Sequence, residues 1–272
     1  MIPRALTIAG SDSCGGAGLE ADLKVFAALG VYGSCAVTAV TAQNSRGVIS
    51  ALGLPADLVA QQIDAVLGDV GADASKTGML SSAPIVEVVA ERLAAHGARN
   101  LVVDPVIAAK DGTRLLSDDG VRAVREKLLP LATLVTPNAP EAEALTGEAV
   151  AGREGMLRAA RALVDLGAKA ALVKGGHLPG AVVDVLWDGQ QQTSFENLRL
   201  PGPPVHGTGC VLAAAIAAYL ARGERLADAV AKGREFLQRA LADTFSTGGS
   251  FRLFAPFGSH NDSQPRAAGP QS

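Results

Sequence analysis

The chain has 272 residues, of which 48% are hydrophobic, and this length is enough for one large domain with a substantial core. Aromatic residues make up only 4%, whereas small apolar residues and glycine are abundant, a composition typical of helices packed closely on a sheet. The formal net charge is −3 and no basic block occurs, which argues against nucleic acid and anionic membranes as partners.

Short apolar runs alternate with longer segments of helical period from one end of the chain to the other. This alternation is typical of βαβ units and predicts an α/β fold with a mostly parallel, doubly wound sheet. In chain order, the predicted strands cover residues 4–9, 34–41, 74–79, 100–104, 132–136, 170–174 and 181–187. The predicted helices cover residues 17–29, 56–69, 83–95, 117–128, 139–145, 154–166, 208–222 and 226–243.

The domain organisation follows from a change in composition near the C-terminus. Residues 1–247 carry the strand and helix pattern without an internal repeat, and they are predicted to form a single domain. Residues 248–272 are polar, rich in proline and glycine, and lack an apolar period. We therefore expect residues 248–272 to form a disordered tail.

The N-terminus and the cysteines indicate a protein of a reducing compartment. The first ten residues hold too short an apolar run for a signal peptide, and no later run reaches the ~18 to 20 apolar residues of a transmembrane helix. Cys14, Cys35 and Cys210 are odd in number and widely spaced, which argues against disulfides. Neither they nor the four histidines show a paired metal-ligand spacing. We expect a soluble, cytoplasmic protein without a zinc site.

Polar or glycine-rich segments follow six of the predicted strands. Because ligands bind beyond the carboxyl ends of parallel strands, these segments are expected to meet at one edge of the sheet. In chain order they are Gly10 to Asp12, Gln43 with Asn44, Lys76 to Gly78, Asp104 with Pro105, Thr136 to Asn138, and Lys174 to Gly176.

The first glycine-rich turn, residues 11–24, leads into a predicted helix and can present backbone N–H groups to a ligand. Its glycines do not have the spacing of the dinucleotide-binding fingerprint, and a tight strand-to-helix connection explains them equally well. Asp22 in this helix is by default a solvated charge. A position facing the cleft would instead let it hydrogen-bond a ligand.

A second glycine-flanked turn runs directly into a strongly apolar helix within residues 204–220. A buried helix of this kind directs its unpaired N-terminal N–H groups at an anion, and a phosphate is the natural occupant. The peptide groups from Gly207 to Cys210 would form the cradle. The chain contains no Walker loop, because the segment around Lys76 lacks the required glycines.

Cys210 stands at the start of this helix, where the N-terminal field is expected to lower the pKa of its thiol. A thiolate at this position can accept a proton from a substrate hydroxyl. The alternative is that Cys210 only fills space as a small buried apolar residue.

Three further polar side chains have both a structural and a functional interpretation. Asn138 and Glu141 match the N-cap and box partner of a helix start. Asp104 and Glu141 also provide the carboxylates that Mg²⁺ uses when water and substrate phosphates complete its shell. Lys174 ends an apolar strand before two glycines, and a cation there suits phosphate neutralisation.

Seven motifs in this order resemble the hydroxymethylpyrimidine/phosphomethylpyrimidine kinases, members of the ribokinase superfamily. The resemblance extends from about Ala5 to Ala242, so it covers nearly the whole chain apart from the predicted tail. The motifs are SDSCGGAGLEADLK, AVTAQNSRGV, KTGML, VVDPV, TPNAPEAEALTG, VKGGHL and HGTGC.

The resemblance implies a ribokinase-like three-layer α/β/α sandwich over residues 1–247, and a homodimer.

 It also implies an enzyme that uses ATP and Mg²⁺ to phosphorylate 4-amino-5-hydroxymethyl-2-methylpyrimidine and then the resulting monophosphate. Matched by motif position, Gln43 resembles the residue that pairs with the pyrimidine edge through its amide. The other pocket positions carried over from the family are Gly10, Asp22, Met79 and Val106.

The phosphate end of the implied site comes from the later motifs. Asp104 and Glu141 resemble the carboxylates that hold Mg²⁺, mostly through water, while Lys174 and Asn138 match positions beside the nucleotide phosphates. The stretch Gly207, Thr208 and Gly209 matches the anion hole. Cys210 takes the place where sugar kinases of the superfamily have a catalytic aspartate, so a thiol as general base is a hypothesis.

Two alternatives remain at this stage. Pyridoxal kinases of the same superfamily can carry the Gly-Thr-Gly-Cys loop, and their substrate is also a small heteroaromatic ring with a hydroxymethyl group. Gln43 and Met79 favour the pyrimidine. A non-catalytic sensor of the pyrimidine is the second alternative, and the presence of Asp104, Lys174 and Cys210 argues against it.

Overall fold

The alternation of short strands and longer helices is retained in the computed structural model, which describes residues 1–109, 111–176, 182–197, 199 and 201–257. The strands are β1 (Arg4–Asp12), β2 (Tyr32–Asn44), β3 (Gly47–Gly53), β4 (Ala74–Thr77), β5 (Leu101–Val103), β6 (Leu134–Val135), β7 (Ala171–Lys174), β8 (Val182–Trp187), β9 (Gln192–Asn197), β10 (Thr244–Ser246) and β11 (Arg252–Phe254). The α-helices are α1 (Gly18–Ala28), α2 (Ala56–Ala65), α3 (Ala83–Ala95), α4 (Asp118–Ala123), α5 (Ala139–Thr146), α6 (Gly152–Asp165), α7 (Thr208–Ala221) and α8 (Leu226–Ala242).

Within the described residues, one nine-stranded sheet has the order β3-β2-β1-β4-β5-β6-β7-β8-β9. Strands β1, β2 and β4 to β7 are parallel, whereas β3 and β8 run antiparallel to their neighbours. The predicted mostly parallel sheet is therefore confirmed. The chain leaves β1 toward β2 on one side and returns to β4 on the other, which opens a crevice at the carboxyl ends of these strands.

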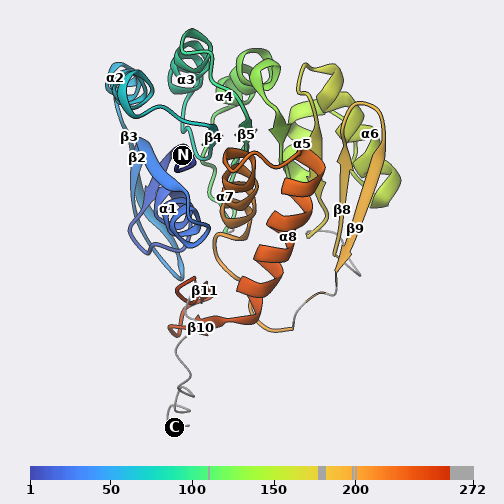
Figure 1. The fold of residues 1–272 in the computed structure, drawn as a ribbon. Helices are drawn as coiled ribbons and strands as arrows, with labels where there is room; N and C mark the ends of the chain where they lie inside the picture. Colours follow the sequence, from blue (N-terminus) through green and yellow to red (C-terminus); the bar gives the residue numbers. More distant parts are fainter. Residues whose placement is uncertain (110, 177–181, 198, 200, 258–272) are drawn as a thin grey trace.

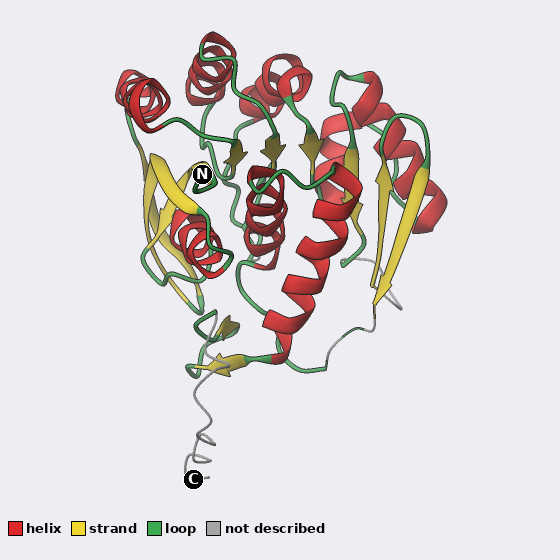
Figure 2. Ribbon diagram, viewed as in Figure 1, coloured by secondary structure: helices red, strands yellow, loops and turns green. Residues whose placement is uncertain are grey.

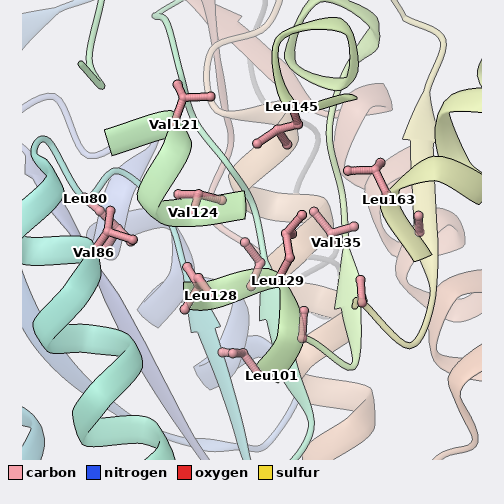
Figure 3. Packing of buried hydrophobic residues seen from close by; sticks show 14 of the residues in the cluster. Leu80, Val86, Leu101, Val121, Val124, Leu128, Leu129, Val135, Leu145 and Leu163 are labelled. Atoms are coloured by element: carbon pink, nitrogen blue, oxygen red, sulfur yellow. The ribbon is translucent and has the colours of Figure 1, made fainter. Parts of the chain in front are cut away.

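Helices cover both faces of the sheet, as expected for a three-layer sandwich (Figures 1 and 2). Side chains of β5 alternate between two buried clusters. Leu101 and Val103 pack in the cluster that includes residues of α2 to α6, which Figure 3 shows from close by. Val102 packs in the second cluster, with α1, α7 and α8.

Helix α7 is apolar on every side because it is enclosed on every side. All its residues from Val211 to Ala221 are buried, and it contacts α1, α8 and the sheet. A helix without a polar face is stable only in such a position. Its packing fixes the N-terminus of α7 at the carboxyl edge of the sheet.

The strands that the sequence did not predict lie at the borders of the fold. Strand β3 has a mostly exposed burial pattern, and β9 is a polar edge strand, so neither shows a buried apolar run. The predicted helices over 56–69 and 117–128 are present, but each ends in a π-helical turn, η1 (Val66–Val70) and η2 (Val124–Leu128).

The predicted tail begins too early. Strand β11 pairs with β10, and Leu253 and Ala255 are buried, so the folded part continues beyond residue 247. The rest of the predicted tail, residues 258–272, lies outside the described residues. No helix in the described ranges is long and apolar enough to cross a membrane.

Candidate active site

A cavity of about 780 Å³ lies where the parallel strands end. It is lined by residues from loops after β1, β4, β5 and β6 and from the start of α7, as the strand-end rule predicts. The predicted site residues that line it are Gly10, Gln43, Met79, Asp104, Val106, Asn138, Glu141, Lys174, Gly207, Thr208, Gly209 and Cys210. Their placement in one cavity is observed, while their roles stay predictions.

The start of α7 is shaped by a glycine that no other residue can replace without strain. Gly207 has a φ of 79°, and a Cβ at this position would lie 1.8 Å from the carbonyl oxygen of Gly16. The first backbone bond of the helix runs from the Val211 N–H to the Gly207 carbonyl. The N–H groups of residues 208–210 therefore precede the helical ladder and are available to an anion.

Lys174 and Asp104 form an ion pair beside this helix start. Lys174 Nζ is 3.0 Å from Asp104 Oδ1, and a Cβ on Gly209 would lie 3.2 Å from Nζ. Burial by itself lowers the pKa of Lys174, but the charges of Asp104 and Glu141 raise it above its usual value. A protonated amine thus stands next to the N–H groups of α7.

Glu141 caps helix α5 and also lies at the cavity, while its role toward a metal ion stays a prediction. Its carboxylate accepts the Asn138 N–H at 2.8 Å, and Asn138 Oδ1 accepts the Glu141 N–H at 2.9 Å, which completes the capping box of α5. Both residues also line the cavity. Burial raises the pKa of Glu141 above its usual value, and Lys174 opposes this change.

Asp22 is the predicted site residue that the structure places elsewhere. It is fully buried, with Oδ2 at 2.8 Å from Lys76 Nζ and 2.6 Å from the Thr7 hydroxyl, and it is absent from the described cavity lining. Neither a solvated charge nor a direct ligand contact describes it. The sequence carries the signal, because Asp22 follows Leu19 by three residues and precedes Phe26 by four on the buried stripe of α1.

Lys76 is a cavity residue to which the sequence assigned no role. It is fully buried in β4, and a lysine in a buried strand requires a partner, which Asp22 supplies. Burial alone lowers the pKa of Lys76, but Asp22, Cys210 and Asp104 raise it above its usual value. A positive charge therefore lies on the Cys210 side of the cavity.

Asp12 and His206 are two further cavity residues without a predicted role. Asp12 Oδ2 lies 2.9 Å from His206 Nε2, so the pair connects the first glycine-rich turn to the loop before α7. The Gln43 side-chain nitrogen is 3.4 Å from the same His206 nitrogen. Residues more than 160 positions apart meet here, and no local sequence pattern reports such a contact.

Comparison with known proteins assigns the family. A family model described as phosphomethylpyrimidine kinase matches residues 12–253. The chain belongs to the phosphomethylpyrimidine kinase family. The hydroxymethylpyrimidine/phosphomethylpyrimidine kinase of Streptomyces coelicolor is 48% identical over 247 residues, which cover 91% of this kinase and 91% of that protein.

Two other similar proteins are a longer bifunctional protein and a pyridoxal kinase of known structure. The thiamine biosynthesis bifunctional protein ThiED of Geobacter sulfurreducens is 49% identical over 237 residues, 87% of this kinase but 48% of that longer protein. The crystal structure of an ADP complex of Bacillus subtilis pyridoxal kinase superposes with a TM-score of 0.88 at 35% identity, covering 94% of this kinase and 98% of that chain. The ribokinase-like fold expected from the resemblance is confirmed.

The carboxylates of the kinase fit a metal ion that arrives with a nucleotide. In the part of the chain that the structure describes, no group of three or more His, Cys, Asp or Glu side chains could hold a metal alone. Asp104 and Glu141 both line the cavity near Lys174. Mg²⁺ commonly uses one or two carboxylates and completes its shell with phosphate oxygens and water, so this sparse set suits it.

The pKa of Cys210 is raised, whereas the sequence predicted a lowered pKa and a thiolate. Burial raises the pKa of the Cys210 thiol to about 11, with Asp22 and Asp104 adding to the rise and Lys76 opposing it. Burial and two nearby carboxylates therefore outweigh the field of the helix start. The thiol of the free kinase is protonated at neutral pH.

Alkylation of Cys210 by iodoacetamide is expected to accelerate throughout the alkaline range. Because the thiolate is the reactive form and the folded pKa is about 11, the rate should still rise ~tenfold per pH unit between about pH 7.5 and 9.5. Peptide-level mass spectrometry separates Cys210 from Cys14 and Cys35. A rate that levels off by pH 8 would restore the thiolate predicted from the sequence.

Proposed function

We propose that this kinase transfers the γ-phosphoryl group of ATP to the hydroxymethyl group of 4-amino-5-hydroxymethyl-2-methylpyrimidine, and then phosphorylates the monophosphate, as a step of thiamine biosynthesis. One observation carries the proposal. The N–H groups at the start of α7 and the amide of Gln43 line the same cavity, so a phosphate site and a hydrogen-bonding site for a ring share one space. The choice of a pyrimidine as the substrate is based on the names of the similar proteins, which are pyrimidine kinases.

At the phosphate end, the peptide groups of Gly207, Thr208 and Gly209 would hold the transferred group while Lys174 neutralises it. Asp104 and Glu141 would hold Mg²⁺, mostly through water, and Asn138 would stand beside the phosphates. When bound, the metal ion supplies charge neutralisation of the phosphate oxygens. Phosphoryl transfer depends mainly on such positioning and electrostatic stabilisation.

Cys210 has a narrower role in this proposal than the sequence implied. Its protonated thiol is not a ready base, so the cavity wall would position the acceptor hydroxyl. As the new O–P bond forms, the hydroxyl proton would pass to an oxygen of the transferred phosphoryl group. The cation of Lys76 lowers the cost of negative charge at Cys210. General-base catalysis by the thiolate would need that charge to be stabilised further in the ternary complex.

At the ring end, Gln43 would pair with the edge of the pyrimidine, and Gly10, Met79 and Val106 would enclose it. Val106 has a φ of 38°, a strained value for a β-branched residue. Such strain persists where the surrounding structure holds the residue, and it is common at ligand sites. A homodimer in the cytoplasm is a further part of the proposal and rests on the family resemblance alone.

Pyridoxal is the second candidate substrate. The observation in its favour is the superposition on a pyridoxal kinase with a TM-score of 0.88 over nearly the full chain. The 48% identity to a hydroxymethylpyrimidine/phosphomethylpyrimidine kinase favours the pyrimidine.

A parallel steady-state assay decides between the two substrates. With ATP and Mg²⁺, we expect kcat/KM to be at least about tenfold higher for hydroxymethylpyrimidine or its monophosphate than for pyridoxal, because the Gln43 amide matches a ring that offers both a donor and an acceptor. A higher kcat/KM for pyridoxal would overturn the proposal. Absence of turnover with all three compounds would favour a sensor.

A further inference from the structure

The wall of the cavity around Gln43 is organised by a single buried carboxylate. Asp12 is 2% exposed, and its two oxygens accept backbone N–H groups from Cys14 at 2.8 Å, Gly16 at 3.1 Å and Ala17 at 2.8 Å. Its Oδ2 atom also lies 2.9 Å from His206 Nε2. This number of donors is far more than a tight turn requires and indicates an ionised group.

Hydrogen bonding keeps Asp12 ionised. Burial by itself raises the pKa of this carboxyl, but hydrogen bonds from the side chains of His206 and Gln43 and from the Ala17 backbone bring the pKa below its usual value. An ionised carboxylate can only accept hydrogen bonds. The His206 nitrogen that faces Asp12 must therefore carry a proton.

This protonation state determines how the Gln43 amide can lie. The proton on His206 Nε2 occupies the position through which that nitrogen would accept, so Nε2 cannot accept a hydrogen bond from the Gln43 nitrogen 3.4 Å away. Asp12 Oδ2 lies 2.9 Å from the same His206 nitrogen, so this carboxylate is the neighbouring acceptor left for the Gln43 NH₂ group, and that interaction helps to lower the Asp12 pKa. The amide oxygen Oε1 and the second N–H of Gln43 are then left for a ligand.

The backbone of Gln43 is held as firmly as its side chain. The Ser13 hydroxyl accepts the Gln43 N–H and donates to the Gln43 carbonyl, both at 2.9 Å. The same turn that carries Asp12 thus fixes both ends of the residue. These contacts fix the main chain of Gln43 at the strand end, so the orientation of its amide depends on the groups that the side chain meets.

We propose that Asp12 is a specificity-determining positioning residue, which fixes the Gln43 amide so that the cavity accepts an amino group beside an unprotonated ring nitrogen. The proposal rests on the pyrimidine kinase function proposed above. Oε1 accepts from the 4-amino group, and the second N–H donates to the adjacent ring nitrogen. A 4-oxo ring presents a carbonyl and a ring N–H at these positions, so acceptor meets acceptor and donor meets donor.

The test is the ratio of kcat/KM for hydroxymethylpyrimidine to kcat/KM for its 4-oxo analogue. A site built for hydrogen bonding rejects a mismatched ligand strongly, so we expect a ratio of at least about 100 for the unmodified kinase. Asp12→Asn can donate as well as accept, which permits the flipped amide, and the ratio should fall ~tenfold or more. The ratio is internal to each variant, so a uniform loss of activity does not change it.

Two variants separate the possible outcomes. Asp73→Asn removes a carboxylate paired with Arg4 at the opposite end of β1 and should leave the ratio unchanged. Gln43→Ala should abolish the preference whichever residue orients the amide. If Gln43→Ala lowers the ratio and Asp12→Asn does not, the role of Asp12 is refuted while the function stands. If the unmodified kinase phosphorylates no pyrimidine, the proposed function itself fails.

A measurement on the unmodified kinase covers the case in which Asp12→Asn does not fold. Hydroxymethylpyrimidine labelled with ¹⁵N at the ring nitrogen beside the amino group is bound and observed by NMR. The free ring nitrogen already accepts hydrogen bonds from water, so a bound resonance at or upfield of the free position shows that it accepts the Gln43 N–H, as the fixed orientation requires. A downfield shift on binding shows a ring nitrogen without a donor, which is the reverse orientation, and overturns the proposal.

Discussion

Lys174→Met is expected to lower kcat about 10²- to 10³-fold, the usual loss when one preorganised stabilising group is removed from a transition state. The amine lies 3.0 Å from Asp104 and next to Gly209 at the start of α7, where the proposed phosphoryl group is transferred. Methionine keeps the length of the side chain but removes the charge. Asp104 and Glu141 would then repel each other without the cation of Lys174.

Lys169→Met is the matched control for this prediction. Lys169 precedes the same strand, β7, but is exposed, so it loses the same charge at a distance from the cavity. Initial rates with saturating ATP and pyrimidine give kcat for both variants. A loss below tenfold for Lys174→Met, or an equal loss for Lys169→Met, would exclude Lys174 from the reaction.

Lys76→Met is expected to lower the free energy of unfolding by about 3 to 5 kcal/mol, the cost of leaving one member of a buried ion pair without its partner. Both side chains are fully buried, and their charged atoms are 2.8 Å apart. Asp22 Oδ1 already has no hydrogen-bond partner among the described residues, so the loss of Lys76 leaves the carboxylate with Thr7 alone. Urea unfolding followed by circular dichroism measures the change.

The double variant Lys76→Met with Asp22→Asn tests whether the unpaired charge causes the loss. Because both charges are removed together, the double variant should recover at least about 2 kcal/mol relative to Lys76→Met. Two additive single effects would show that packing, and not the ion pair, determines the stability at this position.

The periodicity of the sequence determined most of the fold. Buried runs such as residues 100–104 and amphipathic segments such as residues 154–166 depend on local patterns, and the corresponding elements β5 and α6 are observed within two residues of the predicted limits. Strands β3 and β9 escaped prediction because an edge strand needs hydrogen bonds to one neighbour and no buried run. Strand β11 is stabilised by contacts with β10 and the loop at His206, which the local sequence does not encode.

The sequence by itself was also enough to predict that the strand-end residues form one site, because parallel strands place their carboxyl ends along one edge. Only the tertiary structure decided what each charge faces. It turned Asp22 inward to Lys76, joined Asp12 to His206, and raised the pKa of Cys210 instead of lowering it. The physical reason is that burial and pairing depend on distances between residues far apart in the chain, whereas helix and strand patterns depend on neighbours.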